Sequence, residues 1–125
     1  MREQVTIEII DLARNIVDII EDKKGEDIVL LDIREKTIIA DYFVVCSGSS
    51  ERQLKAIVDG IREEVKKKHG IGPRSVEGDA RTGWVLIDYS DIVVHAFSPA
   101  VRSYYDLEGF WEEHGLENRE WFIRE

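Results

Sequence analysis

The sequence is poor in cysteine and has no long apolar run. Its single cysteine, Cys46, excludes a disulfide framework and any zinc site built from cysteines, and suits a reducing compartment. No apolar run approaches the roughly 20 residues that cross a membrane, and the amino-terminal residues lack the features of a signal or transit peptide. We therefore expect a cytoplasmic protein without a membrane partner, a cofactor or a metal site.

A basic surface is lacking as well. The net charge of −9 argues against a general nucleic-acid-binding protein, because contact with phosphates needs Lys and Arg. Residues 51–74 hold seven Lys and Arg against four acids, whereas residues 106–125 hold seven acids against two arginines. An acidic end favours a basic partner, and ribosomal proteins are the commonest basic surfaces in a cytoplasm. On composition alone, a solvated acidic tail is the favoured interpretation.

A β-hairpin is predicted in the second half of the chain. Residues 84–89 and 92–97 are rich in β-branched and aromatic side chains, and only Ser90 and Asp91 separate them. A loop of two or four residues sorts these side chains onto two faces, whereas a loop of three exchanges the partners. One face is almost wholly apolar and requires covering helices: Val85, Ile87, Tyr89, Ile92, Val94 and Ala96. The other, the mixed face, is the candidate working surface: Trp84, Leu86, Asp88, Val93, His95 and Phe97.

Helices and strands alternate in the rest of the pattern, and 125 residues suffice for one core. The prediction is a single compact α/β (α+β) domain over residues 1–114, with a mixed β-sheet and flanking helices, followed by an acidic and aromatic tail over 115–125. Helices are expected over 5–20, closed by Gly25, over 51–69, with Ser50 as N-cap and Gly70 at the end, and from Ser98 onward. Strands are expected over 28–33, 42–46 and 73–78, and a short helical turn over 38–41.

Apolar residues broaden the first helix beyond one face. Ile7, Ile10, Val17 and Ile19 lie outside its main stripe. Core packing explains the main stripe, and the additional positions allow a second contact with another subunit, in other words a homodimer.

Three further motifs admit both a functional and a structural interpretation. The loop 46–50 follows a strand and precedes a helix, so it could cradle phosphate, but a helix cap with a tight turn is the favoured interpretation. Residues 66–68 are three lysines that either oppose the helix dipole or contact a phosphate group. His95 could act as a base with Asp88, but no nucleophile joins them, so packing is the favoured role and no catalytic residue is assigned.

Several ordered motifs resemble the ribosomal silencing factor (Iojap-like) family. The likeness covers roughly residues 5–113 and lies in DYFVVCSGSSERQ at 41–53, EG at 77–78, GWVLIDY at 83–89, DIVVHAF at 91–97 and RSYYDLE at 102–108. It implies a domain related in fold to nucleotidyltransferases but without their catalytic carboxylates. It also implies binding to the large ribosomal subunit through ribosomal protein L-fourteen, which sterically blocks joining of the small subunit and represses translation when nutrients are scarce.

The expected partner-binding residues lie on the mixed face and in the acidic segment that follows it: Trp84, Leu86, Asp88, His95, Phe97, Tyr105, Asp106 and Glu108. Trp84 is either an interface anchor or a core residue. The other hypothesis for the whole chain is a small nucleotidyltransferase-like enzyme or a nucleotide-binding protein. One departure from the family pattern is Ser90, where we expect Gly: if the turn needs a positive φ, Ser carries a strain of about 1 kcal/mol.

Overall fold

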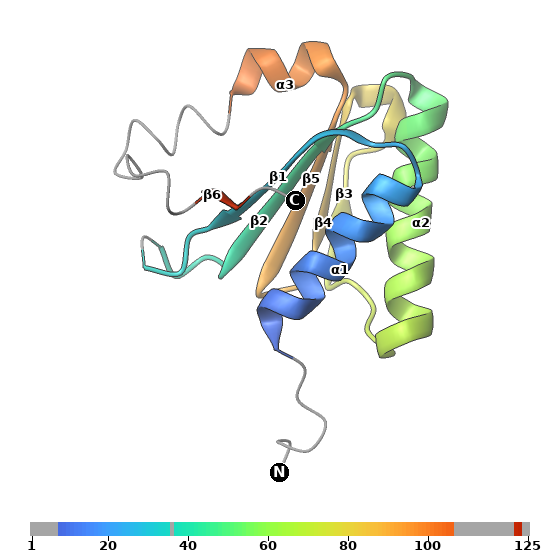
Figure 1. Cartoon of the computed structure of the whole chain (residues 1–125). Coiled ribbons are helices and arrows are strands. Elements are labelled where there is room, and N and C mark those ends of the chain that lie inside the picture. Colours follow the sequence, from blue (N-terminus) through green and yellow to red (C-terminus); the bar gives the residue numbers. More distant parts are fainter. Residues whose placement is uncertain (1–7, 36, 107–121, 124–125) are drawn as a thin grey trace.

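One mixed β-sheet organises the protein (Figure 1). The computed structural model describes residues 8–35, 37–106 and 122–123. The strand order is β3-β4-β5-β2-β1-β6, in which β2 and β5 are parallel and all other neighbours antiparallel. The strands are β1 (Glu26–Asp32), β2 (Tyr42–Ser47), β3 (Ser75–Glu77), β4 (Trp84–Asp88), β5 (Ile92–Phe97) and β6 (Phe122–Ile123). The helices are α1 (Ile9–Asp22), α2 (Glu51–His69) and α3 (Pro99–Tyr105), with a 3-10 turn η2 (Ala80–Thr82). The predicted mixed α/β domain is confirmed.

The two faces of the sheet have different cover. Helices α1 and α2 lie side by side over one face (Figure 1), where their buried residues form the larger core with Val44, Val85, Ile87 and Val94. A smaller cluster on the opposite face includes Phe43, Val45 and Phe97, and Val101 of α3 packs against it. The inner strands β1, β2 and β5 are therefore buried on both faces, as the continuous apolar run of β1 predicts.

The hairpin β4–β5 has the predicted register. Leu86 lies opposite His95, and Trp84 opposite Phe97. The backbone N–H of Tyr89 donates to the carbonyl oxygen of Ile92 at 2.8 Å, so the loop holds two residues. The apolar face consequently meets α1 and α2, and the mixed face meets the smaller cluster.

Helix boundaries agree with the sequence at α2 and differ at α1. The Ser50 side chain caps α2 by accepting from the Gln53 N–H at 3.0 Å, and Gly70 ends it at φ 70°. At the end of α1 the left-handed residue is Lys24, with φ 69°, so the expectation for Gly25 is wrong. Gly25 is needed for space instead, because a Cβ there would lie 2.3 Å from Ile20 Cγ2.

Two other expectations for the first half of the chain change. Residues 38–41 form a bend instead of a helical turn, because the hydroxyl of Thr37 accepts from the Ile39 N–H at 3.1 Å and the Asp41 N–H donates to the Asp91 carbonyl oxygen at 2.8 Å. Val17 and Ile19, which suggested a subunit contact, are buried within their own chain. The homodimer stays a prediction without their support.

The predicted tail is described only at β6, whose Ile123 and Phe122 pair with Leu30 and Leu31 of β1. The domain boundary at residue 114 stays a prediction. No helix in the described part of the chain has the length and apolar character to cross a membrane.

The hairpin loop provides a test of backbone strain. Ser90 has φ 76°, the left-handed conformation that made Gly the expected residue. Replacing it (Ser90→Gly) should raise the free energy of unfolding by about 0.5–1 kcal/mol, measured by urea denaturation. The matched control is Ser103→Gly in α3, which should lower it by a similar amount because Gly disfavours helix. A Ser90→Gly protein that is less stable than the original would contradict the strain argument.

Candidate functional site

The mixed face centres on a contact between Trp84 and His95. The indole Nε1–H of Trp84 donates to Nδ1 of His95 at 3.3 Å. A neutral imidazole that accepts at Nδ1 carries its proton on Nε2. Nε2 is buried and has no partner among the described residues. His95 is thus a neutral packing residue that orients the Trp84 ring.

Aromatic rings surround His95. The Phe43 ring lies edge-on at 4.8 Å between centroids, and the Phe97 ring is stacked at 6.1 Å. The side chain is 5% exposed. Burial among these rings lowers the pKa of His95 to about 4.

Trp84 also joins the mixed face to α3. Its ring centroid lies 5.0 Å from Phe97 and 4.8 Å from Tyr105, and Tyr105 meets Tyr104 edge-on at 4.9 Å. Tyr104 is 81% and Tyr105 50% exposed, whereas Trp84 is half-buried. We call these three residues the aromatic surface. A pocket of about 450 Å³ lies among them and is also lined by Thr82, Ala100 and Val101.

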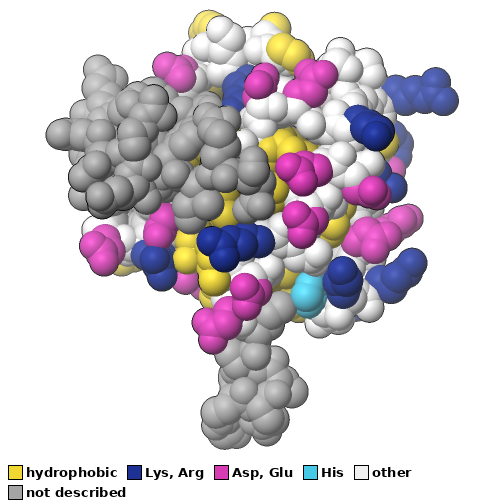
Figure 2. Space-filling view, viewed as in Figure 1, with side chains coloured by type: hydrophobic (Ala, Val, Ile, Leu, Met, Phe, Trp, Pro, Cys, Tyr) yellow, Lys and Arg dark blue, Asp and Glu magenta, His cyan; other side chains and the backbone are white. Residues whose placement is uncertain are grey.

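Acidic side chains lie near the aromatic surface. Figure 2 shows hydrophobic side chains at the top of the view, where α3 lies in Figure 1, with both Asp or Glu and Lys or Arg side chains close to them. Asp106 ends α3 in a left-handed conformation, φ 45°, and its side chain is exposed. Large exposed rings beside carboxylates are suited to contact with a basic protein surface.

Two residues hold α3 against the end of the sheet. Gly83 has φ 86°, and a Cβ on it would lie 2.8 Å from the Ser98 hydroxyl, while its carbonyl oxygen accepts from the Ser98 N–H at 2.8 Å. Arg102 Nη1 donates to the Asp27 carbonyl oxygen at 2.6 Å and to the buried Ser47 hydroxyl at 2.9 Å. The tyrosines are therefore presented by an anchored helix.

The predicted partner-binding residues separate by depth. Leu86 and Asp88 are half-buried, and Asp88 forms an ion pair with Arg74 at 3.0 Å. Phe97 has no exposed surface and lies beneath Trp84 with His95. Tyr105 and Asp106 are exposed next to Trp84, and Glu108 lies outside the described residues. Tyr104 is the residue that sequence reasoning omitted, although its place beside Tyr105 on a short helix was a usable signal.

The remaining sequence motifs have structural roles in the part of the chain that the structure describes. The Ser49 hydroxyl donates to Gln53 Oε1 at 2.7 Å, so with the Ser50 cap the loop 46–50 is an ordered helix start. Cys46 is buried, which raises the pKa of its thiol to about 12 and leaves it a poor nucleophile. Asp88 pairs with Arg74 and His95 with Trp84, so the two do not form a dyad. The lysines 66–68 lie in the last turn of α2, as predicted.

Comparison with known proteins shows that the chain matches a protein family. The family model described as "Ribosomal silencing factor during starvation" matches residues 6–123. A ribosomal silencing factor RsfS from Halalkalibacterium halodurans is 42% identical over 83% of this chain and 86% of its own. The mouse "Mitochondrial assembly of ribosomal large subunit protein 1" is 30% identical over 77% of this chain and 43% of its own. A crystal structure of a Chromobacterium violaceum protein superimposes with a TM-score of 0.80 at 37% identity, covering 84% of this chain and 87% of its own.

The low pKa of His95 predicts a pH-dependent stability. Unfolding returns this pKa from about 4 toward its usual 6.5, so the unfolded chain binds the proton more tightly. The stability that the neutral, buried His95 gives to the fold is fully present above pH 6.5. It is lost as the pH falls toward 4, and the free energy of unfolding decreases by about 3 kcal/mol in total. Urea denaturation between pH 4 and 8 should show this slope, and His95→Gln should reduce it while His69→Gln retains it. An unchanged slope in His95→Gln would contradict the assignment.

Proposed function

The chain belongs to the ribosomal silencing factor family, and on that premise we propose that it binds the large ribosomal subunit through a basic protein of the L-fourteen type. Bound there, it sterically blocks joining of the small subunit and represses translation under nutrient limitation. The cytoplasm is the compartment in which this proposal places it. The name of the mouse relative, which refers to the large ribosomal subunit, supports the choice of that subunit.

The observation that carries the proposal is the exposure of Tyr104 and Tyr105 beside the half-buried Trp84. Large apolar side chains at a protein surface mark contact sites when they are contiguous. Tyrosine and tryptophan are the residues that most often dominate the binding energy of an interface. The acidic Asp106 at the edge of this surface suits a basic partner.

Buried members of the mixed face have a supporting role in this proposal. Phe97 and His95 face other side chains, so they cannot meet a partner without a rearrangement. They orient Trp84 through a ring contact and a hydrogen bond. We therefore propose that the contact consists of the aromatic surface with Asp106, extended by the half-buried Leu86 and Asp88 and by Glu108.

Binding, and not catalysis, is the proposed activity. Ser49 and Ser50 direct their hydroxyls to Gln53 in the loop where a nucleotidyltransferase would bind phosphate. The Asp79 carboxylate accepts from the Thr82 N–H at 3.1 Å and so caps η2. The serine hydroxyls and the Asp79 carboxylate thus have local partners, which supports structural roles for the loop 46–50 and for the start of η2.

Truncation of the aromatic surface tests the proposal. Tyr104→Ala should weaken binding to isolated large subunits about thirtyfold, or about 2 kcal/mol, because it removes an exposed ring from the centre of the contact. Sucrose-gradient co-sedimentation with large subunits measures the affinity, with small subunits as a negative control. Subunit-joining assays should show the same loss.

A matched control keeps the interpretation clear. Ile38→Ala removes another fully exposed apolar side chain, outside the aromatic surface, and should bind normally. Trp84→Ala should lose binding as well, but its contacts with Phe97 and His95 mean that its thermal midpoint must be measured beside it. A folded Tyr104→Ala protein that binds the large subunit and blocks subunit joining like the original would contradict the proposed role of the aromatic surface.

The electrostatic part has a separate test. Asp106→Lys should slow association with the large subunit and reduce its dependence on salt, because the substitution reverses the local field toward a basic partner. Stopped-flow or surface-based kinetics at several salt concentrations measure both effects. Asp18→Lys, an exposed substitution on α1, is the control of equal charge change. If the association rate of the Asp106 variant equals that of the control at every salt concentration, Asp106 takes no part.

A further inference from the structure

The pocket within the aromatic surface is walled by rings that lie in different planes. The planes of Trp84 and Tyr105 are inclined at 44°, with centroids 4.8 Å apart, and Tyr104 stands at 90° to Tyr105 at 4.9 Å. All three rings line the pocket. Because their planes differ, an occupant meets ring faces as well as edges, and the face carries the negative part of an aromatic quadrupole. Such walls attract a cation.

Hydrogen-bonding groups beside the rings already have partners within the protein. The indole N–H of Trp84 donates to Nδ1 of His95 at 3.3 Å. The Thr82 hydroxyl, which also lines the pocket, donates to the Asp79 carbonyl oxygen at 2.8 Å. Apart from the tyrosine hydroxyls, the rest of the lining is aromatic or aliphatic surface. The pocket therefore offers an occupant ring faces more than hydrogen-bond acceptors.

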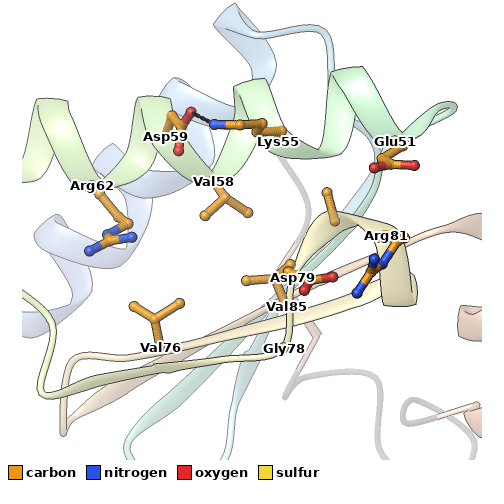
Figure 3. A pocket seen from close by; sticks show the side chains of 11 residues that line it. Glu51, Lys55, Val58, Asp59, Arg62, Val76, Gly78, Asp79, Arg81 and Val85 are labelled. Atoms are coloured by element: carbon orange, nitrogen blue, oxygen red, sulfur yellow. Dashed lines mark hydrogen bonds and ion pairs between the residues drawn. The ribbon is translucent and has the colours of Figure 1, made fainter.

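No basic side chain of the described residues lines this pocket. Two arginines come near it in sequence, and both are directed elsewhere. Figure 3 shows the side chain of Arg81 in a separate cavity between α2 and β3, which Glu51 and Asp79 line as well. Arg102 of α3 donates to the Asp27 carbonyl oxygen at 2.6 Å. A cation that enters the aromatic pocket consequently meets no like charge in the described lining.

The charge of the chain also favours a cation. Asp106 directly follows Tyr105, and its side chain is exposed. The whole chain has a net charge of −9. A negative field raises the local concentration of cationic groups and speeds their association. The ring faces and the field thus select the same chemical class of occupant.

Arginine fits these walls better than lysine does. A guanidinium group is flat, stacks on aromatic faces and is weakly hydrated, whereas an ammonium group is strongly hydrated and needs acceptors in place of its water. The lining of the pocket supplies few such acceptors. The chain forms a contact of this kind within its own fold, since the guanidinium carbon of Arg34 lies 5.3 Å from the centroid of the Tyr42 ring.

From these features we propose that the aromatic pocket binds the guanidinium group of an arginine side chain from a partner protein. The group is held by cation–π contact with Trp84, Tyr104 and Tyr105. The identification of that partner as the basic ribosomal protein rests on the function proposed above, whereas the preference of the pocket for arginine does not.

A pair of small probes tests the proposal on the full chain. N-acetyl-arginine-N-methylamide carries the guanidinium group, and N-acetyl-citrulline-N-methylamide is its neutral isostere. NMR follows binding through the indole N–H signal of Trp84, assigned among the three tryptophans with Trp84→Phe, at matched chloride concentration. The arginine probe should give saturable shifts with a dissociation constant on the order of 10 mM. The citrulline probe should bind at least about tenfold more weakly, and the corresponding lysine probe about threefold more weakly.

Substitutions at Tyr104 separate the ring face from mere apolar bulk. Tyr104 is 81% exposed, so its variants should fold. Tyr104→Phe keeps the ring and should bind the arginine probe within about twofold of the original protein. Tyr104→Leu keeps an apolar side chain without a ring and should bind it about fivefold more weakly. The matched control is Ser103→Ala, an exposed position of α3 that does not line the pocket.

The outcomes separate this proposal from the ribosome contact. No saturable shift of the Trp84 signal up to about 50 mM arginine probe, or equal binding of the arginine and citrulline probes, would overturn the arginine site. Equal affinity of Tyr104→Leu and Tyr104→Phe would overturn it too. Neither result bears on the ribosome contact, which co-sedimentation of Tyr104→Ala decides. Selective binding of the arginine probe, combined with normal co-sedimentation of Tyr104→Ala, would support the arginine site and refute the ribosome contact.

Discussion

The register of the hairpin β4–β5 is the constraint on which the molecule depends. Side chains alternate along a strand, so a slip of one residue would move every apolar side chain of β4 away from the helices. The two-residue loop at Ser90 and Asp91 prevents this slip, and Asp88 supports the loop by accepting the Ser90 N–H at 2.7 Å. The chain tolerates a left-handed serine at this loop because the correct register stabilises the fold by more than the local strain destabilises it.

Presentation of the aromatic surface follows from that register. Trp84 reaches the mixed face only because Val85 faces the helices, and its ring then lies within 5.0 Å of both Phe97 and Tyr105. The backbone of Gly83 approaches Ser98 more closely than any side chain would allow. Arg102 completes the attachment of α3 through a backbone carbonyl and a buried hydroxyl. The exposed tyrosines are thus positioned by residues that are themselves hidden.

The sequence predicts what depends on local periodicity and loses accuracy where distant segments meet. Strand faces, the hairpin register and the ends of α2 follow from alternation, loop length and capping residues, all within a few positions. The bend at residues 38–41 depends on Asp91, fifty residues away, and no local pattern contains that contact. Likewise, the depth of Phe97 and His95 and the exposure of Tyr104 depend on where α3 lies against the sheet. Residue types on the mixed face could be listed in advance, but not their order in depth.

Strand β4 separates two concave regions of the protein. Trp84 belongs to the aromatic surface, whereas Val85, the next residue, lines a cavity of about 460 Å³ between α2 and β3. Adjacent residues of a strand face opposite sides of the sheet, so a partner on one side does not obstruct a partner on the other. Arg81 and Thr82 are neighbours in η2, yet Arg81 lines the cavity between α2 and β3 and Thr82 lines the aromatic pocket, so the two regions meet at this turn.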